Sequence, residues 1–196
     1  NPGFEEVDCS KAAISGLVVK TKEGVCRIKD WDNATSVKSD LILSDTANIA
    51  KEGKYAAGFT AYGTGGNNRE YLIGSIAKPL LEGHTYVYKM NVKISPRSTH
   101  VAFNIGAYFA PNKIKNPQTT PLSYKPQVIS RITPDDYITT STDIRSTSDL
   151  IPWNSGTTLT IEGSFVAMGD EKFVVIGNFD NDKVVLSAPV FPAYAK

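Results

Sequence analysis

Residue types that carry catalysis or bind metals are scarce in this sequence. Its 196 residues include two cysteines and two histidines. G-x-S-x-G, H-E-x-x-H, C-x-x-C and phosphate-cradling glycine motifs are all missing, which argues against the enzyme classes that depend on them. An acid pair for glycoside hydrolysis can come from anywhere in a chain. Glu70, Glu162 and Glu171 are candidates, but no spacing marks a pair, so we expect a protein that is not an enzyme.

Charge of one sign and long apolar runs are also missing. The 21 basic and 20 acidic residues leave a formal charge of +1, which argues against binding to nucleic acid or to an anionic membrane. No run approaches the roughly 18 apolar residues that a membrane-spanning helix needs. The chain begins at Asn1 without a signal peptide, as a processed protein does. We therefore expect a protein that does not span a membrane.

Helical patterns are nearly absent, with one short candidate at 46–54, whereas strand patterns are abundant. Residues 86–94, 101–110 and 159–165 alternate between apolar and polar side chains, as strands with one buried face do. Residues 172–179 are apolar on both sides and predict a central strand covered on both faces. Turn residues separate these runs, so we expect a single antiparallel β-sandwich over residues 1–196. The proline-rich stretch 111–152 predicts edge strands and surface excursions.

The outward positions of the expected strands predict a polar platform on one sheet surface. Sugar-binding sites combine aromatic surface with a few placed polar groups, and an ordinary solvated sheet face has the same composition. The platform residues are Lys89, Asn91, Asn104, Tyr108, Glu162 and Ser164.

Several residues outside the platform have two readings each. Trp31 and Trp153 lie in polar, loop-like contexts and are either buried anchors or ligand platforms. Arg69 and Glu70 follow a glycine-rich stretch and either contact a ligand or form an ion pair or cap at a strand entrance. Cys9 and Cys26 are either a disulfide, which would contribute about 3 kcal/mol, or two buried thiols.

The acidic tip at 177–182 also has two readings, a calcium site or a turn. Asn178, Asp180, Asn181 and Asp182 offer side-chain oxygens of the kind that calcium prefers. No EF-hand spacing is present, however, and the same residues favour a tight turn after a strand. We favour the turn.

Four segments resemble one known family. They are NPGFEEVDC at 1–9, REYLIGSIAKPLLEGHTYVYKMNV at 69–92, FNIGAYFA at 103–110 and GSFVAMGDEKFVVIGNF at 163–179. Together they resemble the jelly-roll, galactose-binding-like domains of Bacteroidota cell-surface proteins, which often precede an outer-membrane-protein-A-like domain. The resemblance implies a jelly-roll β-sandwich, export to the cell envelope, and a carbohydrate-binding or adhesive role.

The same resemblance implies a structural calcium ion, and the sequence departs from the family pattern in one respect. Related jelly rolls hold calcium with a glutamate like Glu5 and with acids near the final strand, here Asp180 and Asp182. Family members continue to a last strand that this chain, which stops at APVFPAYAK, does not contain. The departure predicts an open sheet edge that a partner strand could cover.

We therefore expect a non-catalytic carbohydrate-binding module of an exported cell-envelope protein. The expected ligand-binding residues are Trp31, Arg69, Glu70, Asn104, Tyr108 and Asn178. The alternative is a structural or adhesion module of a surface assembly that binds protein partners, and a glycoside hydrolase is the third reading.

Overall fold

The chain is all-β wherever its structure is described. A computed structural model describes residues 3–9, 17–21, 24–35, 39–43, 55–63, 66–95, 98–115, 120–131, 151–153, 159–183, 185 and 187–192. These residues form fifteen strands and no helix, which confirms the all-β class. The helical pattern at 46–54 lies outside the described residues. Within the described ranges no helix is long and apolar enough to cross a membrane.

A central antiparallel sheet organises the molecule. Its strands, in spatial order, are β11 (Val128–Arg131), β10 (Asn104–Ala110), β14 (Phe173–Gly177), β7 (Leu72–Ser75) and β4 (Trp31–Asn33). In β14, Val174 and Ile176 join one apolar cluster, whereas Val175 joins another on the opposite face. The expectation of a central strand covered on both faces is therefore confirmed.

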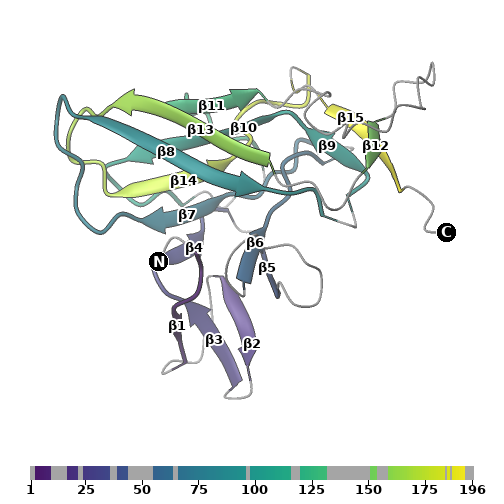
Figure 1. Ribbon diagram of the computed structural model, residues 1–196, viewed down its shortest axis with the longest axis horizontal. Coiled ribbons are helices and arrows are strands. Elements are labelled where there is room, and N and C mark those ends of the chain that lie inside the picture. The colour runs from purple at the N-terminus through teal and green to yellow at the C-terminus, as the bar shows by residue number, and fades with distance from the viewer. Residues whose placement is uncertain are drawn as a thin grey trace.

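One face of the central sheet packs against a second layer. This layer is the antiparallel pair of β8 (Thr85–Val92) and β13 (Leu159–Val166), which crosses over the central sheet in Figure 1. Stacked and edge-on rings join the layers, with Phe109 of β10 at 4.2 Å from Phe165 and 5.8 Å from Tyr88 between ring centroids. The two layers with an apolar core between them give the described part of the chain a sandwich-like architecture.

The opposite, outer face of the central sheet is also covered. Tyr71, Ile73 and Val175 of this face are buried together with Leu122, which belongs to the proline-rich connection. The expected polar platform is therefore wrong as a single surface. Its members on β8 and β13 face solvent on the second layer, whereas Asn104 and Tyr108 belong to β10 of the central sheet.

A small N-terminal sheet packs against the edge of the sandwich. It consists of β1 (Val7–Asp8), β3 (Gly24–Ile28) and β2 (Val18–Thr21), and it extends below the two layers in Figure 1. Leu17, Cys26 and Ile28 are fully buried in the main apolar cluster. Cys9 and Cys26 form a disulfide, which ties the end of β1 to β3.

The remaining strands lie beside the sandwich. They are β5 (Asp40–Leu43), β6 (Tyr55–Gly58), β9 (His100–Ala102), β12 (Ile151–Trp153) and β15 (Ser187–Pro192). β5 pairs with β6, and β15 pairs with β9 and β12. The β12–β15 pairing is parallel, which departs from the expected purely antiparallel arrangement. β15 also shows that the segment after the acidic tip forms a strand.

One close approach in the central sheet predicts a stability effect. A Cβ at Gly177 would lie 2.7 Å from Cε1 of Tyr71, whose ring is fully buried and whose hydroxyl contacts the Asn178 carbonyl and the Leu122 N–H. Because this ring has little room to move, Gly177→Ala should lower the free energy of unfolding by about 1–3 kcal/mol. Chemical denaturation measures the change. Gly66→Ala, where the nearest atom is 4.0 Å away, should change it by less than about 0.5 kcal/mol.

Candidate functional site

Strand register aligns one row of residues across the outer face of the central sheet. Tyr108 lies opposite Val175, Val175 opposite Ile73, and Ile73 opposite Asp32. Three strand spacings separate the ends of this row, a distance of about 14 Å. Val175 and Ile73 are buried in the middle of the row. The two ends, Tyr108 and Asp32, are therefore the places where this face can meet a ligand.

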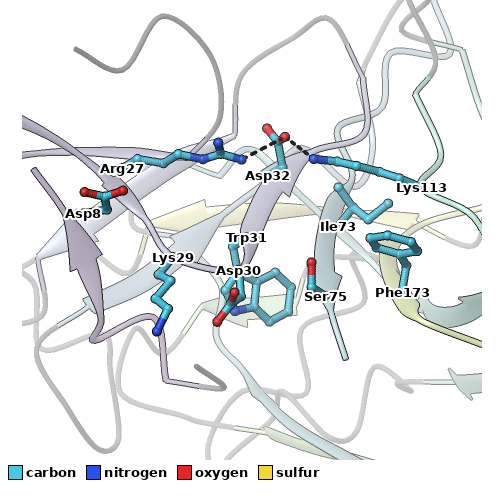
Figure 2. Close-up of a pocket in the computed structure, with 10 residues that line it drawn as sticks. All are labelled: Asp8, Arg27, Lys29, Asp30, Trp31, Asp32, Ile73, Ser75, Lys113 and Phe173. Atoms are coloured by element: carbon cyan, nitrogen blue, oxygen red, sulfur yellow. Dashed lines mark hydrogen bonds and ion pairs between the residues drawn. The ribbon is translucent and has the colours of Figure 1, made fainter. Parts of the chain in front are cut away.

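The Asp32 end of the row opens into a hollow of about 260 Å³, shown in Figure 2 and called the charged hollow below. It lies where the N-terminal sheet, the edge strand β4 and the loop after β10 meet. Its lining residues are Asp8, Arg27, Lys29, Asp30, Trp31, Asp32, Ile73, Ser75, Lys113 and Phe173. Three basic and three acidic side chains give this lining no net charge, so it favours hydrogen bonding over attraction of one ionic type.

Asp32 is the electrostatic centre of the charged hollow. Its Oδ2 accepts hydrogen bonds from Lys113 Nζ at 2.6 Å and from Arg27 at 3.3 Å, and its Oδ1 accepts one from the Asn33 N–H. Burial raises the pKa of Asp32, but the hydrogen bonds from Lys113 and Asn33 and the charges of Lys113 and Arg27 outweigh it and hold the pKa below its usual value. Figure 2 shows the two cations approaching Asp32 from opposite sides. Asp32 thus joins three segments of the chain.

The Tyr108 end of the row carries an aromatic pair. Tyr124 stacks on Tyr108 with ring centroids 4.7 Å apart and an interplanar angle of 20°. Tyr108 is half-buried and also contacts Phe179 edge-on, whereas 42% of Tyr124 is exposed. Since one face of the Tyr124 ring rests on Tyr108, its exposed area lies on the ring edge and on the face directed away from the sheet.

The acidic tip after β14 is built around a buried arginine. Arg69 has no exposed surface, and its guanidinium lies 2.5 Å from Oδ1 of Asp182. The same guanidinium donates to the carbonyl oxygens of Asp180 and Asn68. Asp182 and Asn67 exchange two further hydrogen bonds between backbone N–H groups and side-chain oxygens. A buried guanidinium is tolerated only with such compensation, so the tip holds segment 66–70 in place.

Turn chemistry completes the tip. The side-chain oxygen of Asn178 accepts the N–H of Asp180, and that of Asn181 accepts the N–H of Lys183, as in Asx-turns. Asn104 reaches the tip from β10 and donates to Oδ2 of Asp180 at 2.8 Å. Arg69, Asn104, Asn178, Asp180 and Asp182 therefore lie together, in a largely internal cluster.

The residues expected to hold calcium are engaged with protein groups. Asp182 pairs with Arg69 and Asp180 with Asn104, while Glu5 accepts a hydrogen bond from the Tyr55 N–H. Among the described residues, no group of three or more His, Cys, Asp or Glu side chains is arranged to hold a metal ion.

The other expected site residues have structural partners. Trp31 is 9% exposed, lies 4.7 Å from Phe4 between ring centroids, and is one of the residues that line the charged hollow. Glu70 accepts the N–H of Thr60. Glu171 caps the turn that precedes β14 by accepting the N–H of Met168, and Glu162 pairs with Lys89 on the solvent face of the second layer.

Three residues of the row's ends were missed by the sequence analysis. Tyr124 lies between Pro121 and Pro126 in the proline-rich connection. Its isolation there as an aromatic residue is a sequence signal that could have marked it as a candidate. Asp32 and Lys113 are 81 residues apart, and nothing in their local sequence marks them as partners.

The buried ion pair predicts a large stability effect. Asp182→Asn removes the charge opposite a guanidinium that has no exposed surface, so the free energy of unfolding should fall by about 3–5 kcal/mol. Chemical denaturation measures the loss. Glu162→Gln breaks the Lys89–Glu162 pair, whose side chains are 62% and 54% exposed, and should have little effect. Equal losses for both variants would show that Arg69 does not depend on Asp182.

Asp32 predicts a pH dependence of stability. Because its pKa is lowered in the folded protein, Asp32 stabilises the fold above its unfolded pKa of about 3.9, and this contribution is lost as pH falls through the folded pKa. Asp32→Asn should therefore be less stable than the unmodified protein at neutral pH, and the difference should shrink in acid. Unfolding curves across this pH range test it, with Asp30→Asn, an exposed acid beside the same hollow, as the control.

In comparisons with known proteins, no family model, no curated protein and no solved structure matches this chain. A function for this chain is therefore inferred from the geometry at the Tyr108 and Asp32 ends of the row.

Proposed function

We propose that the chain is a non-catalytic carbohydrate-binding module, of jelly-roll topology, from a protein exported to the cell envelope. The observation that carries this proposal is the exposed ring of Tyr124 stacked on Tyr108. A ring held flat by a second ring presents a rigid apolar surface of the kind on which the C–H face of a sugar stacks.

Polar groups at the margin of the same outer face support the same function. The charged hollow lies at the other end of the row and offers carboxylate, guanidinium and ammonium groups. Sugar hydroxyls both donate and accept hydrogen bonds, so a lining with both kinds of group suits them.

A glycan-array screen of the whole chain tests the proposal. Tyr124→Ala should abolish the binding seen with the unmodified protein, because it removes the exposed stacking surface. Met168→Ala should leave binding unchanged, because Met168 is 83% exposed near the end of β13, in the other layer. Far-UV circular dichroism of both variants verifies folding. Absence of any glycan binding by the unmodified protein would refute the function, and repeating the screen with a calcium chelator would show whether a metal is required.

Protein binding by a structural or adhesion module is the second candidate. It is favoured by four exposed apolar side chains at one end of the second layer, with exposed fractions from 59% to 83%. They are Leu81, Val87, Val166 and Met168. Apolar groups gathered on one surface are typical of protein interaction sites.

A further inference from the structure

The segment that carries Tyr124 is anchored to β10 at successive points. Tyr124 rests on the second ring of the aromatic pair. Pro126, two residues on, packs beside Gly106, where an added Cβ would lie 2.9 Å from Cγ of the proline. Gln127 then bonds the backbone N–H and C=O of Phe109 through its side-chain amide, at 2.9 and 3.1 Å. These contacts hold the segment in place on the outer face from Tyr124 onward.

Alternate residues of this segment face the sheet. Leu122, Tyr124 and Pro126 contact the sheet or its apolar cluster. Ser123 and Lys125, which lie between them in the sequence, are exposed. Successive side chains of an extended chain point to opposite sides, and a residue before proline is restricted to such a conformation. Ser123 and Lys125 are therefore directed away from the sheet, one on either side of Tyr124.

The described parts of the connection over the outer face carry only positive charge. Residues 111–115 and 120–127 contain three lysines and no arginine, aspartate or glutamate. Lys113 is paired with Asp32. Lys115 and Lys125 are exposed, and neither forms an ion pair with any residue that the structure describes. The whole chain is nearly neutral, so this excess of positive charge is a local feature.

The acidic tip, whose Phe179 contacts the aromatic pair, does not cancel this charge. Its two acids, Asp180 and Asp182, are balanced by the guanidinium of Arg69 and by Lys183 within the same cluster of loops. The surroundings of the exposed ring are therefore positive.

We propose that the aromatic pair binds an acidic glycan, with a sugar ring stacked on Tyr124 and the anionic group of the glycan at Lys125. This inference rests on the proposed function and names the class of its ligand. A lysine ammonium is a point charge that pairs with carboxylate and sulfate alike. Adjacent Cα atoms are about 3.8 Å apart, so the long Lys125 side chain reaches substituents of a ring that rests on Tyr124. On the other side of the ring, the Ser123 hydroxyl both donates and accepts hydrogen bonds.

An array that contains neutral, uronic-acid, sialylated and sulfated glycans tests the inference on the full chain. We expect acidic glycans to give the strongest signals, and the carboxylate and sulfate arms to show which anion is preferred. Neutral glycans that bind as strongly as acidic ones would overturn this inference and leave the proposed function intact. Binding of no glycan at all would refute the proposed function itself.

A charge variant locates the anionic group. Lys125→Gln should weaken binding of the strongest acidic glycan about threefold to fivefold at low salt, a loss typical of one exposed ion pair. The loss should shrink at about 500 mM salt, because exposed charges are then screened. Binding of a neutral glycan should be unaffected by this variant. Isothermal titration calorimetry measures each affinity.

Lys89→Gln is the matched control. It removes the same charge from the solvent face of the second layer, on the opposite side of the sandwich, so it should bind acidic glycans like the unmodified protein. Far-UV circular dichroism verifies that each variant folds. Unchanged binding by Lys125→Gln, or equal weakening by Lys125→Gln and Lys89→Gln, would each overturn the inference.

Discussion

Arg69 and Asp182 meet inside the protein across 113 residues of sequence, and the register of the central sheet depends on their contact. Arg69 lies three residues before β7, and Asp182 lies five residues after β14. Bringing these two points together aligns the start of one strand with the end of its antiparallel neighbour. The same alignment places Val175 beside Ile73 and so completes the row from Tyr108 to Asp32. A register slip would leave a buried guanidinium without a counter-charge, which is strongly unfavourable.

Both faces of the central sheet are covered by other parts of the chain, and this restricts where a ligand can bind. One face is occupied by the β8–β13 layer and the other by the proline-rich connection that carries Leu122 and Tyr124. A sheet covered in this way cannot offer a broad open platform to a ligand. A ligand can therefore bind only at the margins of the covered outer face, where Tyr124 is exposed and where the charged hollow opens. The segment that carries Leu122 and Tyr124 is therefore part of the apolar core and part of the candidate site.

The sequence predicts the local features of this fold well and the long-range ones poorly. Alternation in β8 and the apolar run of β14 correctly identify an amphipathic strand and a central strand, because both patterns depend on residues within one strand. The tip at 177–182 is correctly read as a turn from its Asn and Asp residues. The sequence offers an ion pair as one reading of Arg69, but its partner Asp182 could not be found in this way, because ion pairing across the fold leaves no periodic signal. For the same reason alternation could not show that Tyr124 covers Tyr108, or that the polar positions of β8 and β10 belong to different layers.

The disulfide between Cys9 and Cys26 has a mechanical consequence when the chain is pulled from its N-terminal end. Tension applied through residue 9 passes through the covalent bond directly to residue 26 in β3, so the loop between them bears no load and adds no extension. From β3 the force reaches Ile28, which is fully buried, and then the edge strand β4, where Asp32 is held by cations from two other segments. Resistance to pulling from this end is thus set by the packing of β4 against β7, and the N-terminal sheet behaves as a short, nearly inextensible tether.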